Sequence, residues 1–217
     1  MRYSNSTGAY GLNHDDVISL LPGIPGREMV KSICLGLWHE KNGYRGPGSL
    51  YFSSHAEFFL GRCGDVEEPG RIDTILEIRT EDMLKKDISG PLLGIEIKTS
   101  PNNLLSKRDN LTTKYINSGQ CNYYFLVASE DILAMQACIK YMEDPRIGVA
   151  SLSSGKLLKL PISMDISDEG IERYRRQLEE RAAASPECSY HKYYERDRDW
   201  IEVKMKDYLQ DGKVIRT

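Results

Sequence analysis

The sequence predicts an α/β fold in which helices flank a central mixed sheet, followed by a helical C-terminal extension. Two segments rich in isoleucine, Arg71–Arg79 and Pro91–Thr99, have the composition and turn boundaries of strands. A third segment, Tyr123–Ala128, is a short continuous apolar run, which is typical of a strand buried on both faces. Segments with helical spacing lie on both sides of these strands, so a sheet covered by helices is the simplest packing.

The chain begins with a polar stretch, residues 1–26, that we interpret as a tail and an entry loop. The spacing of Met29, Ile33 and Leu37 then predicts a helix over Gly26–Lys41, which Asn42-Gly43 ends. Residues 44–59 are ambiguous, because two glycines and a proline precede an aromatic stretch.

The segments that follow the second strand complete the predicted core, residues 27–162. The connection over 80–90 is charged and has no apolar periodicity. Beyond the buried run, Asp131–Met142 is predicted to be a helix, and 147–152 with 156–162 a hairpin.

The C-terminal part, residues 167–217, is predicted to form two charged helices within one domain of 217 residues. The first helix, over 167–184, has a narrow apolar stripe, and the second includes 199–209. Because each narrow stripe can bury only one side, we expect these helices to hold a homodimer, with packing on the chain's own core as the alternative. The two stripes are Ile171, Tyr174, Leu178 and Trp200, Val203, Tyr208.

Composition and charge exclude several classes of protein. Hydrophobic residues make up 40% and charged residues 28% of the chain, as in ordinary globular proteins. The 29 basic and 32 acidic residues give a net charge of -3, which excludes a chain that is basic throughout but allows a local basic face. No apolar run approaches the roughly 18 residues of a membrane span, and the first residues lack a signal-peptide pattern. We therefore expect a soluble, cytoplasmic protein without a membrane partner.

The cysteines agree with an intracellular compartment. They are odd in number, none lies close to another, and no C-x-x-C occurs, so we expect buried, reduced thiols. The five are Cys34, Cys63, Cys121, Cys138 and Cys188.

Three charged residues in the predicted strands carry chemistry. Glu96 and Lys98 are two residues apart, so both side chains leave the same face of their strand. Asp73 stands in an apolar strand, where a carboxylate needs a reason, and it can join the pair if the two strands are neighbours. An isolated E-x-K is more often a solvated face, so the interpretation depends on all three residues together.

Such a set suits the hydrolysis of phosphodiester bonds. Two carboxylates can bind Mg²⁺ (or Mn²⁺) through oxygen and leave positions for water and phosphate. Lys98 can orient or deprotonate the water and offset the negative charge of the transition state. We therefore expect Asp73→Ala and Glu96→Ala to abolish cleavage and to leave the fold intact.

The residues resemble the PD-(D/E)XK nuclease superfamily, whose restriction-endonuclease-like core is a helix, a three-stranded meander, a helix and a further strand. Asp73 matches its first acidic motif and Glu96-Ile97-Lys98 its E-x-K, although Ile72 stands where the name of the motif has proline. The resemblance implies that Asp73 and Glu96 hold the metal, with the backbone carbonyl of Ile97 as a further ligand. It also implies supporting roles for two more residues, Glu28 in the first helix and Gln120 before the buried strand.

A finer resemblance is to archaeal Holliday junction resolvases, in which an early Glu precedes a Gly/Ser loop whose Ser can assist catalysis. It points to Ser49, while the insertion over 51–69 and the near-neutral charge depart from that family. Glu57 is an alternative acidic ligand, and an exposed surface Glu is the plainer interpretation. Several arginines and lysines, among them Arg173, Arg175 and Arg176, can touch phosphates or form a solvated face.

The sequence thus predicts a Mg²⁺-dependent endonuclease that acts on DNA and has junction-resolvase-like structure specificity. The alternative is a catalytically silent protein that keeps the nuclease fold and serves in nucleic-acid binding or assembly.

Overall fold

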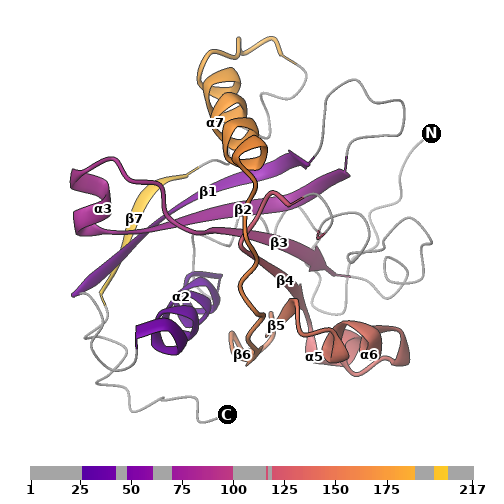
Figure 1. Ribbon diagram of the computed structural model, residues 1–217. Coiled ribbons are helices and arrows are strands. Elements are labelled where there is room, and N and C mark those ends of the chain that lie inside the picture. The colour runs from indigo at the N-terminus through magenta and orange to yellow at the C-terminus, as the bar shows by residue number, and fades with distance from the viewer. Residues whose placement is uncertain are drawn as a thin grey trace.

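A mixed sheet of seven strands forms the centre of the computed structural model (Figure 1). The structure describes residues 26–42, 48–60, 70–99, 116, 119–188 and 198–204. The strands are β1 (Ser49–Leu60), β2 (Gly70–Thr80), β3 (Leu92–Lys98), β4 (Tyr123–Ala128), β5 (Ile147–Ser151), β6 (Leu157–Lys159) and β7 (Arg198–Lys204). The helices are α2 (Gly26–Asn42), α3 (Glu81–Lys85), α5 (Glu130–Leu133), α6 (Gln136–Glu143) and α7 (Asp168–Ala182).

The strands follow the order β6-β5-β4-β3-β2-β1-β7. Strands β1, β2 and β3 form an antiparallel meander, whereas β4 is parallel to β3 and β5 is parallel to β4. The outer strands β6 and β7 are antiparallel to their neighbours. The predicted α/β fold with a mixed sheet and flanking helices is therefore confirmed.

Each face of the sheet carries its own hydrophobic core, because successive side chains of a strand point to opposite faces. On one face, Ile95 and Ile97 of β3 belong to the cluster that α2 covers. Met29, Ile33 and Leu37, spaced four residues apart, supply the apolar side of α2. The other face carries a second cluster that includes residues of α5, α6 and α7, among them Ile132, Tyr141 and Tyr174.

Strands β3 and β4 lie in the middle of the sheet and are buried on both faces along their full length. This explains the continuous apolar run of β4 and makes the two charged residues of β3 unusual. Gly94 has a packing reason on β3: a Cβ there would lie 2.6 Å from Cδ1 of Ile72 and 3.0 Å from the ring of Tyr124.

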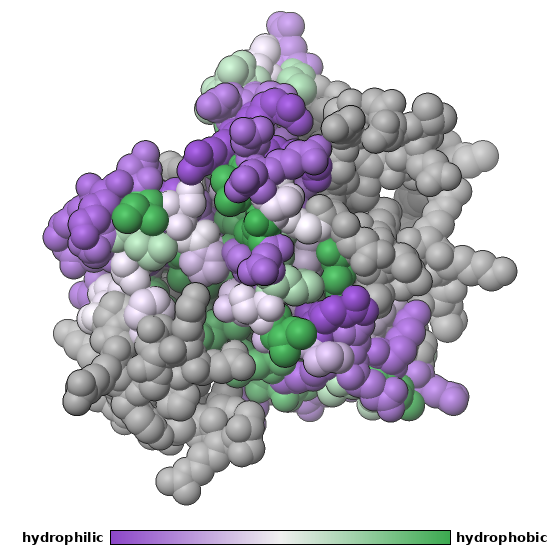
Figure 2. Space-filling model, in the orientation of Figure 1, coloured by the Kyte–Doolittle hydropathy of each residue, from purple (hydrophilic) through white to green (hydrophobic). Residues whose placement is uncertain are grey.

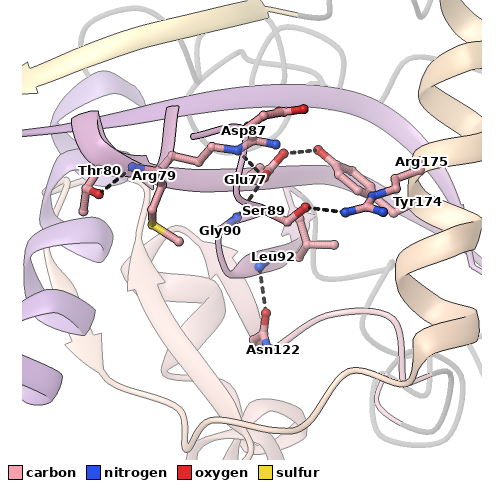
Figure 3. Close-up of polar contacts among 11 residues, drawn as sticks. Glu77, Arg79, Thr80, Asp87, Ser89, Gly90, Leu92, Asn122, Tyr174 and Arg175 are labelled. Carbon is pink, nitrogen blue, oxygen red and sulfur yellow. Dashed lines mark hydrogen bonds and ion pairs between the residues drawn. The ribbon is translucent and has the colours of Figure 1, made fainter. Parts of the chain in front are cut away.

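Helix α7 crosses the β1–β2 part of the sheet and is fastened to it by a buried tyrosine (Figures 1 and 3). It begins after Ser167, whose hydroxyl accepts a hydrogen bond from the N–H of Gly170. Tyr174 is buried and Leu178 packs against the second cluster, so the first predicted stripe packs on the chain's own core. The outward surface of α7 is hydrophilic (Figure 2).

The second predicted C-terminal helix is wrong. Residues 198–204 form strand β7, which pairs with β1 in antiparallel fashion, so the C-terminal extension is not entirely helical. The segment alternates in a strand-like way, since Trp200 and Glu202 are exposed while Ile201 packs on the first cluster. Residues 198–204 adopt a strand because the edge of β1 supplies backbone hydrogen-bond partners for them. Trp200 and Val203 thus belong to a strand, and Tyr208 lies outside the described residues.

Three smaller differences concern local structure. Within the ambiguous segment, residues 49–59 belong to the long strand β1, and residues 44–47 lie outside the described residues. The charged connection contains the short helix α3, which Thr80 caps through the N–H of Met83. The helix predicted over 131–142 is two helices, α5 and α6.

In the described part of the chain, no helix is long and apolar enough to cross a membrane.

Candidate functional site

Asp73, Glu96 and Lys98 are brought together at the carboxyl end of β3. The pairing of β2 with β3 includes Thr74 opposite Ile95, so Asp73 and Glu96 follow one step further on neighbouring strands. All three side chains are buried; Asp73 is 8%, Glu96 4% and Lys98 5% exposed. The condition set by the sequence, that the two strands be neighbours, is thus met.

Glu96 and Lys98 form a buried ion pair. The Lys98 ammonium donates to Oε1 of Glu96 at 2.7 Å, and 6% and 5% of the two side chains are exposed. The pair therefore does not belong to a solvated face, the plainer interpretation of an E-x-K motif. Charges are taken out of water only at a large cost in free energy, so this pair needs good geometry or a function to be retained.

Asp73 also has a backbone partner on β3. Its Oδ2 accepts a hydrogen bond from the N–H of Ile97 at 2.6 Å. The carboxylate thus takes the place of a backbone acceptor at the end of the β2–β3 pairing and fixes the peptide that joins Glu96 to Ile97. Because this N–H is buried, the contact serves the fold as well as the site.

Small residues occupy the positions beside Lys98 on the next two parallel strands, β4 and β5. Ala128 of β4 pairs with Lys98, and Ser151 of β5 pairs with Ala128. The Ser151 hydroxyl donates to Oε1 of Glu130 at 3.2 Å. Glu130 is thus a further carboxylate at the carboxyl edge, where open α/β sheets place their ligands. We did not predict a role for Glu130, although two polar residues directly after a buried strand can indicate a functional position.

Gln120 does not join the three residues. It lies at the start of β4, whose first residue, Tyr123, pairs with Leu93 of β3, while Glu96 pairs with Leu126 further along. Parallel strands begin at the same edge, so a residue before β4 and a residue at the end of β3 belong to opposite edges. The supporting role predicted for Gln120 is therefore wrong. Its amide is fully buried and has no hydrogen-bond partner within the described chain.

Glu28 lies in the first turn of α2, and its side chain is outside the described residues. The helix covers the face of Ile95 and Ile97, while Glu96 and Lys98 alternate with them and point to the other face. The supporting role of Glu28 stays a prediction.

The two further candidates on β1 lie at different ends of that strand. The Ser49 hydroxyl donates to Oε1 of Glu202 at 2.7 Å, and Leu50 pairs with Thr80. Since Thr80 is seven residues from Asp73, roughly 23 Å along β2, Ser49 is remote from the carboxylates.

Glu57 lies at the opposite end of β1 from Ser49. Its neighbours Ala56 and Phe58 pair with Thr74 and Ile72, so its backbone is beside Asp73. The side chain of Glu57 is outside the described residues.

A third buried carboxylate, Glu77, has a structural role (Figure 3). Its Oε1 accepts from Nε of Arg79 at 2.6 Å and from the N–H of Gly90 at 2.9 Å, and its Oε2 accepts from the Tyr174 hydroxyl at 3.2 Å. Burial and the Glu77 charge raise the pKa of Tyr174. Glu77 is four residues from Asp73, roughly 13 Å along β2, so it fastens α7 and does not belong to the site. Its place in an apolar strand was the same signal that identified Asp73.

The arginines of α7 have partners on the chain itself. Arg173 contacts Glu169 at 3.4 Å, Arg175 donates to the Ser89 hydroxyl, and Arg176 lies 3.9 Å from Glu180. Arg175 and Arg176 are exposed and belong to a solvated helix face, whereas only 10% of the Arg173 side chain is exposed.

The donor set of carboxylate oxygens suits a cation that prefers oxygen ligands, such as Mg²⁺ or Mn²⁺. Within the described ranges no three His, Cys, Asp or Glu side chains gather closely enough to form a metal cage. Mg²⁺, however, is commonly held by one or two carboxylates together with water and substrate phosphate. The adjacent carboxylates of Asp73 and Glu96 fit that requirement.

Comparison with known proteins gives no family. No protein-family model matches the chain, and no curated protein matches it. Among solved structures, it is similar to a protein of unknown function from Silicibacter pomeroyi, with 13% identity and a TM-score of 0.36. That match covers 73% of this chain and 88% of the other. The function has to be inferred from the residues of the site.

Proposed function

We propose that this chain is a metal-dependent nuclease that hydrolyses phosphodiester bonds of DNA. One observation carries the proposal: two carboxylates, Asp73 and Glu96, and one ammonium, Lys98, converge in a buried position at the carboxyl end of β3. Asp73 also serves the fold through the N–H of Ile97, but the buried Glu96–Lys98 pair is costly for stability alone, since apolar residues of similar size would serve the core as well or better. A function in phosphodiester hydrolysis accounts for keeping that pair beside a second carboxylate.

The order of the elements supports the same proposal. Helix α2 precedes an antiparallel meander, β1-β2-β3, and β4 returns parallel to β3. Asp73 is on the second strand of the meander and the E-x-K residues are on the third. These elements agree with the arrangement that the resemblance to the PD-(D/E)XK superfamily implies, and the helix expected between β3 and β4 falls on residues outside the described part of the chain.

The proposed mechanism assigns a separate role to each residue. Asp73 and Glu96 would hold Mg²⁺, with the carbonyl of Ile97 as a further ligand; when bound, the ion polarises the phosphoryl oxygen and favours hydroxide at neutral pH. Lys98 positions the attacking water and offsets the charge that develops on the phosphate. Asp73 additionally fixes the Glu96–Ile97 peptide through its hydrogen bond with the Ile97 N–H.

A cleavage panel tests the proposal. Linear duplex, single-stranded, flap and four-way junction DNA are incubated with the full chain and Mg²⁺, and junction cleavage would support structure specificity. We expect cleavage that EDTA abolishes and that Asp73→Asn and Lys98→Gln lose, while the exposed-site control Lys85→Gln retains it. DNA binding without cleavage of any substrate would favour the silent binding protein, and neither binding nor cleavage would favour an assembly role.

The expected homodimer needs a different surface from the two apolar stripes predicted in residues 167–217. The stripe on α7 packs on the chain's own sheet, and Trp200 and Val203 belong to a sheet strand. A two-fold dimer still suits an enzyme that cuts both strands of a duplex. Light scattering of the full chain at micromolar concentration tests it, and a monomer would exclude it.

A further inference from the structure

The ion pair between Lys98 and Glu96 has a consequence for how the site binds its ligands. The carboxylate that is proposed to hold a cation is already in contact with a cation of the chain, at 2.7 Å. Because the pair is buried, water screens the two charges only weakly. The ammonium therefore competes with any metal ion for Glu96.

A divalent ion held by Asp73 and Glu96 would lie close to the Lys98 ammonium. The divalent ion and the ammonium would repel each other strongly at close range, because the site excludes water. In the absence of another anion, Lys98 thus lowers the affinity of the site for the ion. The chain's own lysine acts as an internal competitor.

A phosphodiester changes this balance. Its oxygens can accept hydrogen bonds from the Lys98 ammonium and can also ligate Mg²⁺ directly. When Lys98 turns to the phosphate, the Glu96 carboxylate is released for the ion. The phosphate takes over the role that Glu96 has in the ion pair.

We infer that Lys98 makes the binding of the divalent ion and of the phosphodiester mutually dependent, so that the ion binds weakly alone and tightly with the nucleic acid. The inference rests on the proposed function. Binding linkage requires the effect to be reciprocal: the ion must strengthen DNA binding by the same factor. Such a site would hold its metal mainly when a substrate is present.

Binding measurements test the inference without turnover. Calorimetry gives the Ca²⁺ affinity of the full chain, alone and saturated with a short DNA duplex, and a denaturing gel verifies that the duplex stays intact. Fluorescence anisotropy gives the DNA affinity with and without Ca²⁺. For the wild type we expect Ca²⁺ to bind at least about tenfold more tightly with DNA, within the range of ordinary coupling energies.

Two variants separate Lys98 from the direct contact between metal and phosphate. Lys98→Gln keeps a hydrogen-bond donor beside Glu96 and removes the charge, so Ca²⁺ alone should bind about tenfold more tightly and the coupling should shrink. Lys85→Gln is the matched control, because Lys85 forms an exposed pair with Glu81 at 2.6 Å; it should leave both affinities unchanged. Circular dichroism verifies that both variants are folded.

The possible failures are distinguishable. Equal Ca²⁺ affinity of the wild type with and without DNA would overturn the inference, whatever the variants do. Unchanged coupling and unchanged metal affinity in folded Lys98→Gln would also overturn it. A wild type that binds neither Ca²⁺ nor Mn²⁺, or whose binding survives Asp73→Asn, would refute the proposed metal site itself.

Discussion

Asp73 and Ile97 are joined across β2 and β3 by a hydrogen bond of 2.6 Å, from the backbone N–H of Ile97 to Oδ2 of the carboxylate. A residue singled out for metal chemistry therefore also closes the end of the pairing between two central strands. The expectation that its removal leaves the fold intact does not take this contact into account. Both roles can be separated by experiment.

Asp73→Ala should destabilise the protein, whereas Asp73→Asn should do so much less. The alanine leaves the buried N–H of Ile97 without this acceptor, which costs about 1 to 3 kcal/mol, while the asparagine can offer its amide oxygen. Urea unfolding followed by circular dichroism measures the difference. Both variants should lose cleavage equally; equal stability of the two would contradict the structural role of the carboxylate.

Replacing one member of the Glu96–Lys98 pair should cost more than replacing both. Glu96→Leu leaves the Lys98 ammonium buried without this carboxylate, and Lys98→Met does the reverse, each at about 3 to 5 kcal/mol. The double variant has neither charge and should recover most of the loss. Thermal unfolding of the three variants and the wild type closes the cycle, and simple addition of the two single effects would show that the charges do not interact.

Tyr174→Phe should loosen α7 from the sheet. The substitution removes the hydrogen bond from the tyrosine hydroxyl to the buried Glu77 carboxylate and should lower the free energy of unfolding by about 1.5 to 3 kcal/mol. Arg176→Ala, at an exposed site on the same helix, is the control and should change it by less than about 0.5 kcal/mol. Urea unfolding measures both, and an effect of similar size in the two variants would contradict the fastening role.

The described cysteines should differ in reactivity in the order of their exposure. Cys34, Cys121 and Cys138 are buried free thiols, and burial raises the pKa of Cys34 and of Cys121 to about 12. At pH 8 their reactive thiolate fraction is therefore very small. Cys188 is only partly buried.

Brief alkylation with iodoacetamide, mapped by mass spectrometry, measures this order. Cys188 should be modified in the native protein well before Cys34 and Cys121, and all three should react readily in guanidinium chloride. Early native labelling of Cys34 would contradict its burial. Cys63 lies outside the described residues.

The sequence alone determined the elements whose patterns are strong. The alternation of Ile95 and Ile97 with Glu96 and Lys98, the apolar run of β4 and the four-residue spacing of Met29, Ile33 and Leu37 are local properties, and each predicted its element. The carboxylate of Asp73 in an apolar strand predicted a candidate site from a local property as well, because a buried charge needs a compensating partner or a function.

Only the tertiary structure decided the rest, because the deciding contacts are distant in sequence. Residues 198–204 are a strand through pairing with β1, about 150 residues earlier, and no local pattern contains that partner. Because β4 is parallel to β3, Gln120 lies at the opposite edge of the sheet from Glu96. Because β2 is antiparallel to β3, Asp73 lies beside Glu96. Strand direction and neighbours thus determine which of the charged residues meet, and they are properties of the whole sheet.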